Sequence, residues 1–249
     1  MSLRDDALEM HRENQGKLEI TPNVKVTNKQ QLSLAYSPGV AEPCKEIHED
    51  SRKVYEYTIK GNTVAVVTDG TAVLGLGNIG AEASIPVMEG KAALFKSFAG
   101  INGVPIALDT TDTQEIIKTV KLIAPNYGGI NLEDISAPRC FEIEETLKKE
   151  TNIPIFHDDQ HGTAIVTMAG LINALKIVDK ELTDIKVVLN GAGAAGIAIV
   201  KLLHAYGVNN MIMCDSKGAI YSGRNFGMND TKTYVAKWTN KDKVEGSLE

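Results

Sequence analysis

The chain has little of several residue types, and each shortage excludes a class of protein. Its 249 residues include 3 cysteines and 1 tryptophan, and aromatic residues make up 5% of the total. Cys44, Cys140 and Cys214 lie far apart and form no CxxC pair, which argues against a disulfide scaffold or a thiolate metal site. We therefore expect small, buried cysteine side chains and a reducing, cytoplasmic compartment.

Positive charge and long apolar runs are also scarce. The chain has 26 Lys and Arg against 32 Asp and Glu, which gives a formal net charge of −6. Because nucleic-acid surfaces need clustered basic residues, we expect no nucleic-acid partner. No apolar run approaches the roughly 18 residues of a membrane span, and charges flank the apolar residues near the N-terminus. We therefore expect neither a membrane segment nor a signal peptide.

The sequence does contain a series of short β-branched runs, each followed by a helical pattern. Strands are predicted at 63–68, 104–108, 129–132, 153–156, 186–189 and 211–214. Helices are predicted at 88–98, 112–122, 138–149, 163–178 and 195–206. Apolar strands that alternate with helices indicate an α/β fold, with a parallel sheet covered on both faces.

A polar stretch at 179–184 separates two such series, and we place a domain boundary there. Residues 1–180 would form an N-terminal α/β domain. Residues 181–249 would form the first part of a Rossmann-type dinucleotide-binding domain. A complete dinucleotide fold has two βαβαβ halves, and only about one strand–helix–strand unit is present. The sequence therefore predicts a chain that is truncated at its C-terminus.

Acidic residues follow the four predicted strands of the first domain. They are Asp69, Asp109, Glu133, Asp134, Asp158 and Asp159. Because ligands of an open α/β sheet bind outside the carboxyl ends of its strands, these carboxylates should converge on one edge. So many like charges need a counter-cation, and Mg²⁺ or Mn²⁺ suits oxygen ligands. The alternative is that each acid only caps a helix or a turn, and we interpret Asp69 in that way.

Two glycine motifs precede predicted helices. Gly191, Gly193 and Gly196 come directly after a predicted strand, and Asp215 ends the next strand about 20 residues later. This arrangement is typical of a dinucleotide site, in which the glycines admit a pyrophosphate to a helix N-terminus and the acid binds the ribose. The second motif, at 75–80, stands well past the end of its strand. We interpret it as a tightly packed loop near the active-site edge.

Proton-transfer groups cannot be identified from single residues. Tyr36 lies in a turn with Pro and Gly that could point it into a cleft, but ordinary packing is the simpler interpretation. Lys91 lies among small and apolar residues of a predicted helix, either as a surface residue or as a desolvated base. The histidines show no paired metal-ligand spacing, and we assign none of them a catalytic role.

Together these segments resemble the malic enzymes, in the family's order and over nearly the whole chain. The likeness is to the shorter bacterial type. The similar segments are YSPGVA (Tyr36 to Ala41), DGTAVLGLGNIG (Asp69 to Gly80), GKAALF (Gly90 to Phe95), NLEDI (Asn131 to Ile135), HDDQHGTA (His157 to Ala164) and GAGAAG (Gly191 to Gly196).

The resemblance implies roles for individual residues. Tyr36 matches the family's catalytic tyrosine, Lys91 its catalytic lysine, and Asp158 an acidic neighbour of that lysine. The family's metal-ligand carboxylates match Glu133, Asp134 and Asp159. Its cofactor site matches Gly191, Gly193, Gly196 and Asp215.

The resemblance also implies a reaction, the oxidative decarboxylation of malate to pyruvate and CO₂ with Mg²⁺ or Mn²⁺ and NAD. NADP is the alternative cofactor: the charge of Asp215 would repel a 2′-phosphate, whereas Lys217 could accept one. We expect a homodimer, and the position of Tyr36 leaves open whether it serves its own subunit or a neighbour's. Two other functions stay open: a malolactic-type conversion of malate to lactate, and a truncated nucleotide- or metal-binding module without turnover.

Two departures from the family pattern affect the substrate site. Larger members have an arginine just after the TDG turn that binds the substrate carboxylate. This chain has Ala72 or a neighbour at that place, and it has no arginine between Arg52 and Arg139. The family's asparagine-containing segments, which contact substrate and nicotinamide, lie beyond the end of this chain. We therefore expect that the substrate carboxylate is recognised in another way.

Overall fold

The computed structural model describes residues 2–247, and its internal contacts divide the chain into two units. Unit 1 comprises Met1–Asn131 and Leu147–Ile155, and unit 2 comprises Leu132–Thr146 and Phe156–Glu249. The division into domains at 1–180 and 181–249 stays a prediction.

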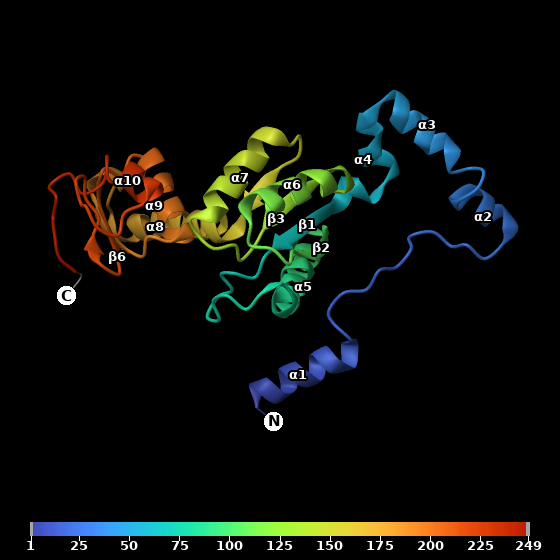
Figure 1. The fold of residues 1–249 in the computed structure, drawn as a ribbon, viewed down its shortest axis with the longest axis horizontal. Helices are drawn as coiled ribbons and strands as arrows, with labels where there is room; N and C mark the ends of the chain where they lie inside the picture. Colours follow the sequence, from blue (N-terminus) through green and yellow to red (C-terminus); the bar gives the residue numbers. More distant parts are fainter. Residues whose placement is uncertain (1, 248–249) are drawn as a thin grey trace. The chain divides into compact units, whose positions relative to one another are not determined.

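The elements follow the predicted alternation along the chain (Figure 1). The helices are α1 (Leu3–Asn14), α2 (Lys29–Ala35), α3 (Ala41–Glu49), α4 (Val54–Tyr57), α5 (Ala81–Ala99), α6 (Thr113–Ile123), α7 (Arg139–Glu150), α8 (Thr163–Val178), α9 (Ala194–Ala205) and α10 (Asp230–Val235). The strands are β1 (Thr63–Thr68), β2 (Asn102–Ala107), β3 (Gly129–Leu132), β4 (Ile155–His157), β5 (Lys186–Asn190), β6 (Asn210–Asp215) and β7 (Gly218–Ala219). A π-helical turn, η4 (Asp158–Gly162), joins β4 to α8.

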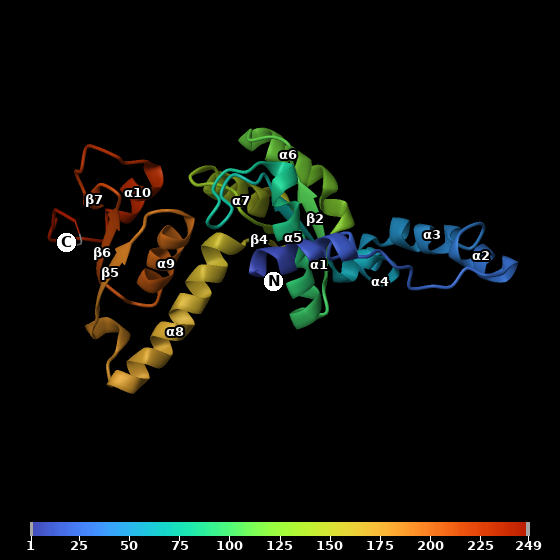
Figure 2. The same cartoon turned by 90° about the horizontal axis from the view of Figure 1, so that it is seen from below.

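Strands β1 to β4 form one parallel sheet in the order β2-β1-β3-β4. In the β1–β2 pair, Thr63 lies opposite Asn102 and Thr68 opposite Ala107. All of β1 except Val64 is buried, as expected for a strand covered on both faces. Figures 1 and 2 show α5 and α6 on opposite faces of this sheet. The predicted α/β fold with a parallel sheet is therefore confirmed.

Helix α5 begins earlier than the sequence pattern predicts. It starts at Ala81 rather than at residue 88, so Pro86 lies inside the helix. A proline inside a helix has no N–H to donate, which is why the pattern favoured a later start. The first turn makes one additional bond, because the Ser84 hydroxyl donates to the Ala81 carbonyl at 2.6 Å.

Helix α5 packs closely against β2. A Cβ added to Gly103 would lie 2.6 Å from the Cα of Ala92, so only glycine fits at this point of the strand. Met88 and Ala92 are fully buried on the same helix. Because Lys91 precedes Ala92 in the chain, this close contact fixes where Lys91 lies on unit 1.

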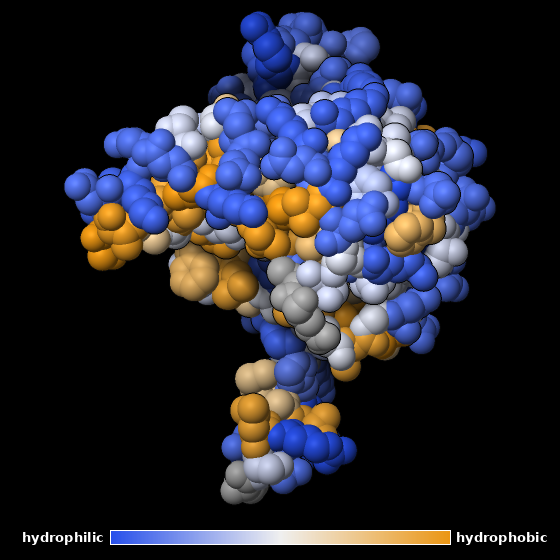
Figure 3. Space-filling model, turned by 90° about the vertical axis from the view of Figure 1, so that its left-hand side faces the viewer, coloured by the Kyte–Doolittle hydropathy of each residue, from blue (hydrophilic) through white to orange (hydrophobic). Residues whose placement is uncertain are grey.

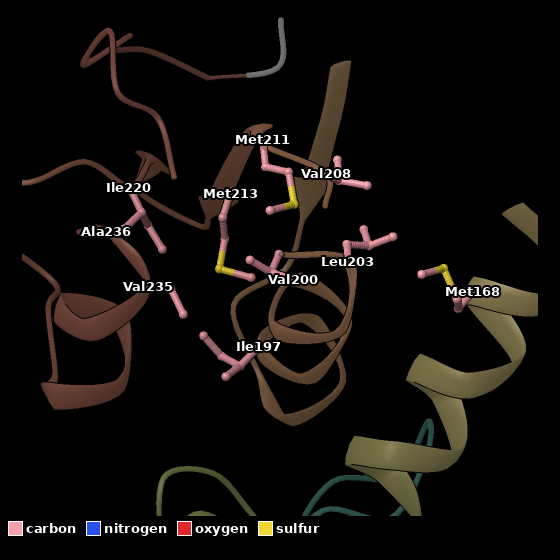
Figure 4. Packing of buried hydrophobic residues seen from close by; sticks show 10 residues of the cluster. All are labelled: Met168, Ile197, Val200, Leu203, Val208, Met211, Met213, Ile220, Val235 and Ala236. Atoms are coloured by element: carbon pink, nitrogen blue, oxygen red, sulfur yellow. The ribbon is translucent and has the colours of Figure 1, made fainter. Parts of the chain in front are cut away.

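Unit 2 contains a second sheet, in the order β5-β6-β7. Its first pair is parallel, with Lys186 opposite Asn210, and the short β7 pairs antiparallel with the end of β6. Figure 4 shows apolar side chains of β6, α9 and α10 pointing toward one another, and burial stabilises each by roughly 1.5–3 kcal/mol. The residues of this core are Met168, Ile197, Val200, Leu203, Val208, Met211, Met213, Ile220, Val235 and Ala236.

Helix α8, together with the turn before it, is more apolar than the sequence analysis expects. Within residues 2–247, the stretch Asp158–Val178 is long and apolar enough to cross a membrane, by length and composition alone. This corrects the expectation that no run approaches that length. The stretch begins with two aspartates, which disfavour insertion, and its Met168 belongs to the core of unit 2. Of the apolar window in this stretch, 17% is buried, so most of α8 is exposed in the described part of the chain.

The cysteines only partly match the expectation of buried side chains. Cys140 and Cys214 are buried, but Cys44 is exposed. The expectation is wrong for Cys44 because it lies on α3, where none of the described residues is buried.

An ion-pair cluster around Asp215 joins the end of β6 to the segment around α10. Arg224 donates through Nη1 to Oδ1 of Asp215 at 3.0 Å and through Nη2 to Oδ2. Lys232 donates through Nζ to Oδ2 at 2.8 Å. The hydrogen bond from Arg224, helped by that from Lys232, holds the pKa of Asp215 well below its usual value. Arg224 also donates to the backbone carbonyls of Gly218, Ala219 and Gly227.

We expect Asp215→Asn to lower the free energy of unfolding by about 3 kcal/mol or more at neutral pH, because buried Arg224 would lose its countercharge. The folded-state pKa of Asp215 is lowered, so its contribution is present above the unfolded pKa of about 4 and is lost as the pH falls toward the folded value. The difference from wild type should therefore shrink in acid.

Chemical denaturation of both proteins at several pH values measures this difference. Asp242→Asn, at an exposed acid of the same unit, is the matched control and should change stability by no more than about 0.5 kcal/mol. A deficit in Asp215→Asn that stays constant from neutral pH into acid would contradict the role given to its ionised form.

Candidate active site

Three of the acidic residues that follow strands come together in unit 2. Glu133 and Asp134 follow β3, and Asp159 follows β4. One oxygen of each lies within 4.8 Å of the others. Glu133 and Asp134 are buried, and Asp159 is half-buried. Burial and mutual repulsion both disfavour three ionised carboxylates at this spacing, so the arrangement favours a bound cation.

The cluster does not include the other three acids that follow strands, Asp69, Asp109 and Asp158. Asp69 is buried after β1, and its Oδ1 accepts hydrogen bonds from the N–H and the hydroxyl of Thr71 at 3.1 and 2.6 Å. This is the turn-forming role that the sequence predicts for it. Asp109 is exposed, and Asp158 is half-buried with its Oδ1 close to Gly162.

Backbone geometry connects the two segments that supply the cluster. Asp134 has φ +55°, in the left-handed region that residues other than glycine rarely adopt. Its N–H donates to Oδ2 of Asp159 at 2.9 Å. A residue keeps such a conformation only where its surroundings stabilise it, and such residues gather at functional sites. The hydrogen bond therefore fixes the chain after β3 against the chain after β4.

A buried histidine and a buried glutamate adjoin the cluster, and sequence analysis gave neither a role. His157 is fully buried, with Nδ1 3.8 Å from Oδ2 of Asp159. Burial lowers the pKa of His157, so its ring is neutral at neutral pH. Glu144, on α7, accepts the His157 N–H at 3.1 Å and lies 2.8 Å from Nε2 of His161. The only signal in the sequence is that two histidines flank the pair Asp158–Asp159.

Cys140 lies near Asp159 and Glu144, but its protonated thiol cannot act as a metal ligand. Burial, together with the charges of Asp159 and Glu144, raises the pKa of the Cys140 thiol to about 12. The thiol therefore stays protonated at neutral pH, and the oxygen donors of Glu133, Asp134 and Asp159 remain the candidate ligands. Such a donor set fits a hard divalent cation such as Mg²⁺ or Mn²⁺.

The loop between β5 and α9 fits a dinucleotide. Gly191 has φ +123°, and its N–H donates to the Cys214 carbonyl at 2.9 Å. A Cβ on Gly196 would overlap the Gly191 carbonyl oxygen, so glycine permits the helix to pack this closely. A Cβ on Gly193, the N-cap of α9, would meet nothing within 4 Å. The open space at this helix N-terminus is where a pyrophosphate could bind.

The second glycine motif has a different structure from the one expected. A Cβ on Gly75, Gly77 or Gly80 would meet nothing within 4 Å, so the prediction of a tightly packed loop is wrong at these positions. All three have positive φ, between +73° and +80°, which explains glycine there. Gly80 is the N-cap of α5, whose first residues form part of unit 1.

Asp215 lies at the end of β6, as the dinucleotide pattern predicts, but its charge is compensated. Its oxygens already accept bonds from Arg224, Lys232 and the backbone N–H of Lys217. The sequence suggests Lys217 as a group that could accept a 2′-phosphate, and it gives no sign of the Arg224 and Lys232 side chains that bind Asp215 in the structure. Because two cations offset its charge, Asp215 repels a 2′-phosphate less than the sequence argument assumed.

The two predicted proton-transfer residues belong to unit 1. Tyr36 is the C-cap of α2 and is 69% exposed, so the described residues do not enclose its ring. Lys91 is half-buried on α5, between Gly90 and the buried Ala92. The structure thus brings together the predicted metal ligands, and separately the predicted cofactor residues, within unit 2.

Models of two domain families match the chain. The malic enzyme N-terminal domain matches residues 15–148, and the malic enzyme NAD-binding domain matches residues 160–246. A bifunctional malic/malolactic enzyme of Bacillus subtilis (strain 168) is 71% identical over 248 residues, which is 100% of this chain and 60% of that protein. An NADP-dependent malic enzyme of Escherichia coli (strain K12) is 50% identical over 98% of this chain and 33% of that protein.

A solved structure agrees with this likeness. The crystal structure of an NAD-dependent malic enzyme from Thermotoga maritima has a TM-score of 0.95 at 49% identity, over 98% of this chain and 65% of that one. The chain therefore spans less than two thirds of the length of each of these relatives. Its motifs, its two domain matches and its fold agree, and the chain belongs to the malic enzyme family.

Proposed function

We propose that the protein oxidises malate and decarboxylates it to pyruvate and CO₂, with reduction of NAD and a requirement for Mg²⁺ or Mn²⁺. The main observation in its favour is the cluster of Glu133, Asp134 and Asp159, in a chain of the malic enzyme family. NADP is the alternative cofactor, because relatives of both preferences are similar to the chain. We place the enzyme in the cytoplasm.

In this proposal, Glu133, Asp134 and Asp159 hold the divalent cation, which when bound stabilises negative charge on substrate oxygens as a Lewis acid. The loop at 191–196 would hold the pyrophosphate of the dinucleotide, which would supply the hydride acceptor. Lys91 accepts the proton of the malate hydroxyl, and the family pattern gives Asp158 the role of its acidic neighbour. Tyr36 protonates the enol carbon after CO₂ leaves, which gives pyruvate.

A second candidate reaction is the malolactic one, in which malate gives lactate and the dinucleotide is not consumed. The similarity to the bifunctional enzyme of Bacillus subtilis favours keeping it. The third candidate is a metal- or nucleotide-binding module without turnover. Incubation with malate, Mn²⁺ and NAD separates them, because the products are pyruvate with NADH, lactate without net NADH, or none.

We also propose a homodimer, on the basis of the N-terminal segment. None of the described residues in α1, α2 or α3 is buried, and Ile20, Leu34 and Tyr36 are 99%, 71% and 69% exposed. In Figure 3, α1 lies at the lower end of the view and shows hydrophobic side chains among charged ones. Apolar residues exposed along a whole segment favour contact with a second chain.

The metal proposal predicts that Glu133→Gln and Asp159→Asn each abolish Mn²⁺ binding at concentrations that saturate the wild type. Each change removes one charged oxygen ligand from the cluster, which a divalent cation needs. Free Mn²⁺ measured by electron paramagnetic resonance gives the dissociation constant. Asp109→Asn is the control, because this exposed acid lies outside the cluster, and wild-type affinity in Glu133→Gln would contradict the ligand assignment.

The cofactor proposal predicts that Gly193→Val blocks binding of NADH, because the new side chain would fill the open space at the N-terminus of α9. Nucleotide fluorescence during titration measures the affinity for NADH and NADPH, and we expect NADH to bind the wild type more tightly. Gly75→Asn is the control, since asparagine tolerates positive φ and this loop should not bind pyrophosphate. Equal loss of affinity in both variants would contradict the assignment.

The proton-transfer proposal predicts that Lys91→Ala and Tyr36→Phe each lower malate turnover by about 10²–10⁴-fold, at different steps. Decarboxylation of added oxaloacetate needs no hydroxyl deprotonation, so it should partly survive in Lys91→Ala. Added methylamine should restore part of that variant's malate turnover. Enolisation of added pyruvate should suffer most in Tyr36→Phe. Wild-type malate turnover in Tyr36→Phe would show that Tyr36 only packs.

Mixing these two inactive variants tests whether Tyr36 acts across the dimer. If Tyr36 serves the neighbour's Lys91, each mixed dimer has one intact pair, and activity should return to roughly a quarter of wild type. We expect this recovery because the Tyr36 ring is exposed on its own chain. Pairs formed within one subunit would give no recovery on mixing.

A further inference from the structure

Glu144 is a buried acid on α7 that contacts two residues of a different chain segment. Its side chain is 4% exposed. One oxygen, Oε1, accepts the backbone N–H of His157 at 3.1 Å, and the other, Oε2, lies 2.8 Å from Nε2 of His161. Burying a carboxylate is costly unless its oxygens are hydrogen-bonded, so these contacts explain why it is tolerated here.

These two contacts of Glu144 lie at the two ends of one turn. His157 is the last residue of β4, and His161 lies within η4, the turn Asp158–Gly162. Asp159 lies between them. The Glu144 carboxylate therefore contacts the chain on both sides of Asp159. Asp159 is the residue that joins Glu133 and Asp134 in the acidic cluster.

The same cluster depends on register between two chain segments. Oδ2 of Asp159 accepts the N–H of Asp134 at 2.9 Å, and the fully buried His157 ring lies 3.8 Å from that oxygen. A small rotation of η4 would move the Asp159 oxygens away from those of Glu133 and Asp134. Glu144 opposes such a rotation because it holds both ends of the turn from a separate helix.

We infer that Glu144 is a positioning residue for the divalent-cation site: it orients Asp159 through His157 and His161 and does not contact the ion. This inference rests on the proposed metal site. Residues that hydrogen-bond the segment of a metal ligand set its orientation, and their loss typically lowers metal affinity by about 10–100-fold. A residue needed only for folding would lower stability without changing the affinity of the folded protein.

The test compares Glu144→Gln with Glu145→Gln. Both variants remove one negative charge from α7, but Glu145 is exposed and serves as the matched control for long-range electrostatics. In Glu144→Gln the amide oxygen can still accept the His157 N–H, whereas the amide nitrogen can bond Nε2 of His161 only after that ring changes tautomer. We expect Mn²⁺ affinity to fall about 10–100-fold in Glu144→Gln and less than about threefold in Glu145→Gln.

Two measurements separate positioning from folding. Electron paramagnetic resonance of free Mn²⁺ gives the dissociation constant, and thermal unfolding in EDTA gives the stability of the metal-free protein. A weaker dissociation constant with a wild-type unfolding midpoint supports positioning. Wild-type affinity in Glu144→Gln, or an equal loss in both variants, overturns it.

Two further results also test the inference. If Glu144→Gln does not fold, His161→Gln removes the ring at the other end of the same contact, and wild-type Mn²⁺ affinity in that variant overturns the inference. If the wild-type protein itself binds no Mn²⁺, the metal site of the proposed function fails and the positioning role fails with it. Binding by the wild type without any difference between variants overturns the positioning role alone.

Discussion

Repulsion among neighbouring carboxylates constrains the geometry at the ends of β3 and β4. Two unit charges about 4 Å apart repel by about 4 kcal/mol at an effective dielectric of about 20, and the cluster contains three such groups within 4.8 Å. The fold accepts this cost and adds another, the left-handed backbone of Asp134. A hydrogen bond from that residue to Asp159 offsets part of it. Sites that retain such unfavourable local features are usually functional, and here a cation would remove the largest one.

The sequence predicts this site where its signals are local. Glu133, Asp134, Asp158 and Asp159 follow runs of apolar residues, and parallel strands end at the same edge, so the pattern predicts an acidic cluster there. The choice of Asp159 over Asp158 as a ligand rests on the resemblance to the malic enzymes. The glycine loop is likewise a local pattern between a strand and a helix. Such features need only the positions of neighbouring elements along the chain, and the structure places them as the pattern indicates.

The parts that the sequence could not predict depend on angles between elements. Glu144 meets His161 only because α7 crosses beside η4, and nothing in the spacing of these residues specifies that crossing. Arg224 reaches Asp215 because the chain folds back after β7, and the spacing of the two residues in the sequence does not specify that fold. Pro86 hid the start of α5 for a simpler reason, since a proline usually ends a helical pattern. The sequence also does not predict what contacts the apolar residues of α1 and α2, because hydrophobicity does not identify the surface that covers them.

The proposed binding and proton-transfer residues lie in different parts of the chain, and this has a consequence for how function is measured. Glu133, Asp159 and the loop at 191–196 belong to unit 2, whereas Tyr36 and Lys91 belong to unit 1. A change at Lys91 leaves the residues of unit 2 that would bind metal and dinucleotide chemically intact. Affinity and turnover are then separate observables, as they must be when catalysis depends on groups that stabilise only the transition state. Retained Mn²⁺ and NADH affinity together with lost turnover would therefore assign a unit 1 variant to the chemical step rather than to binding.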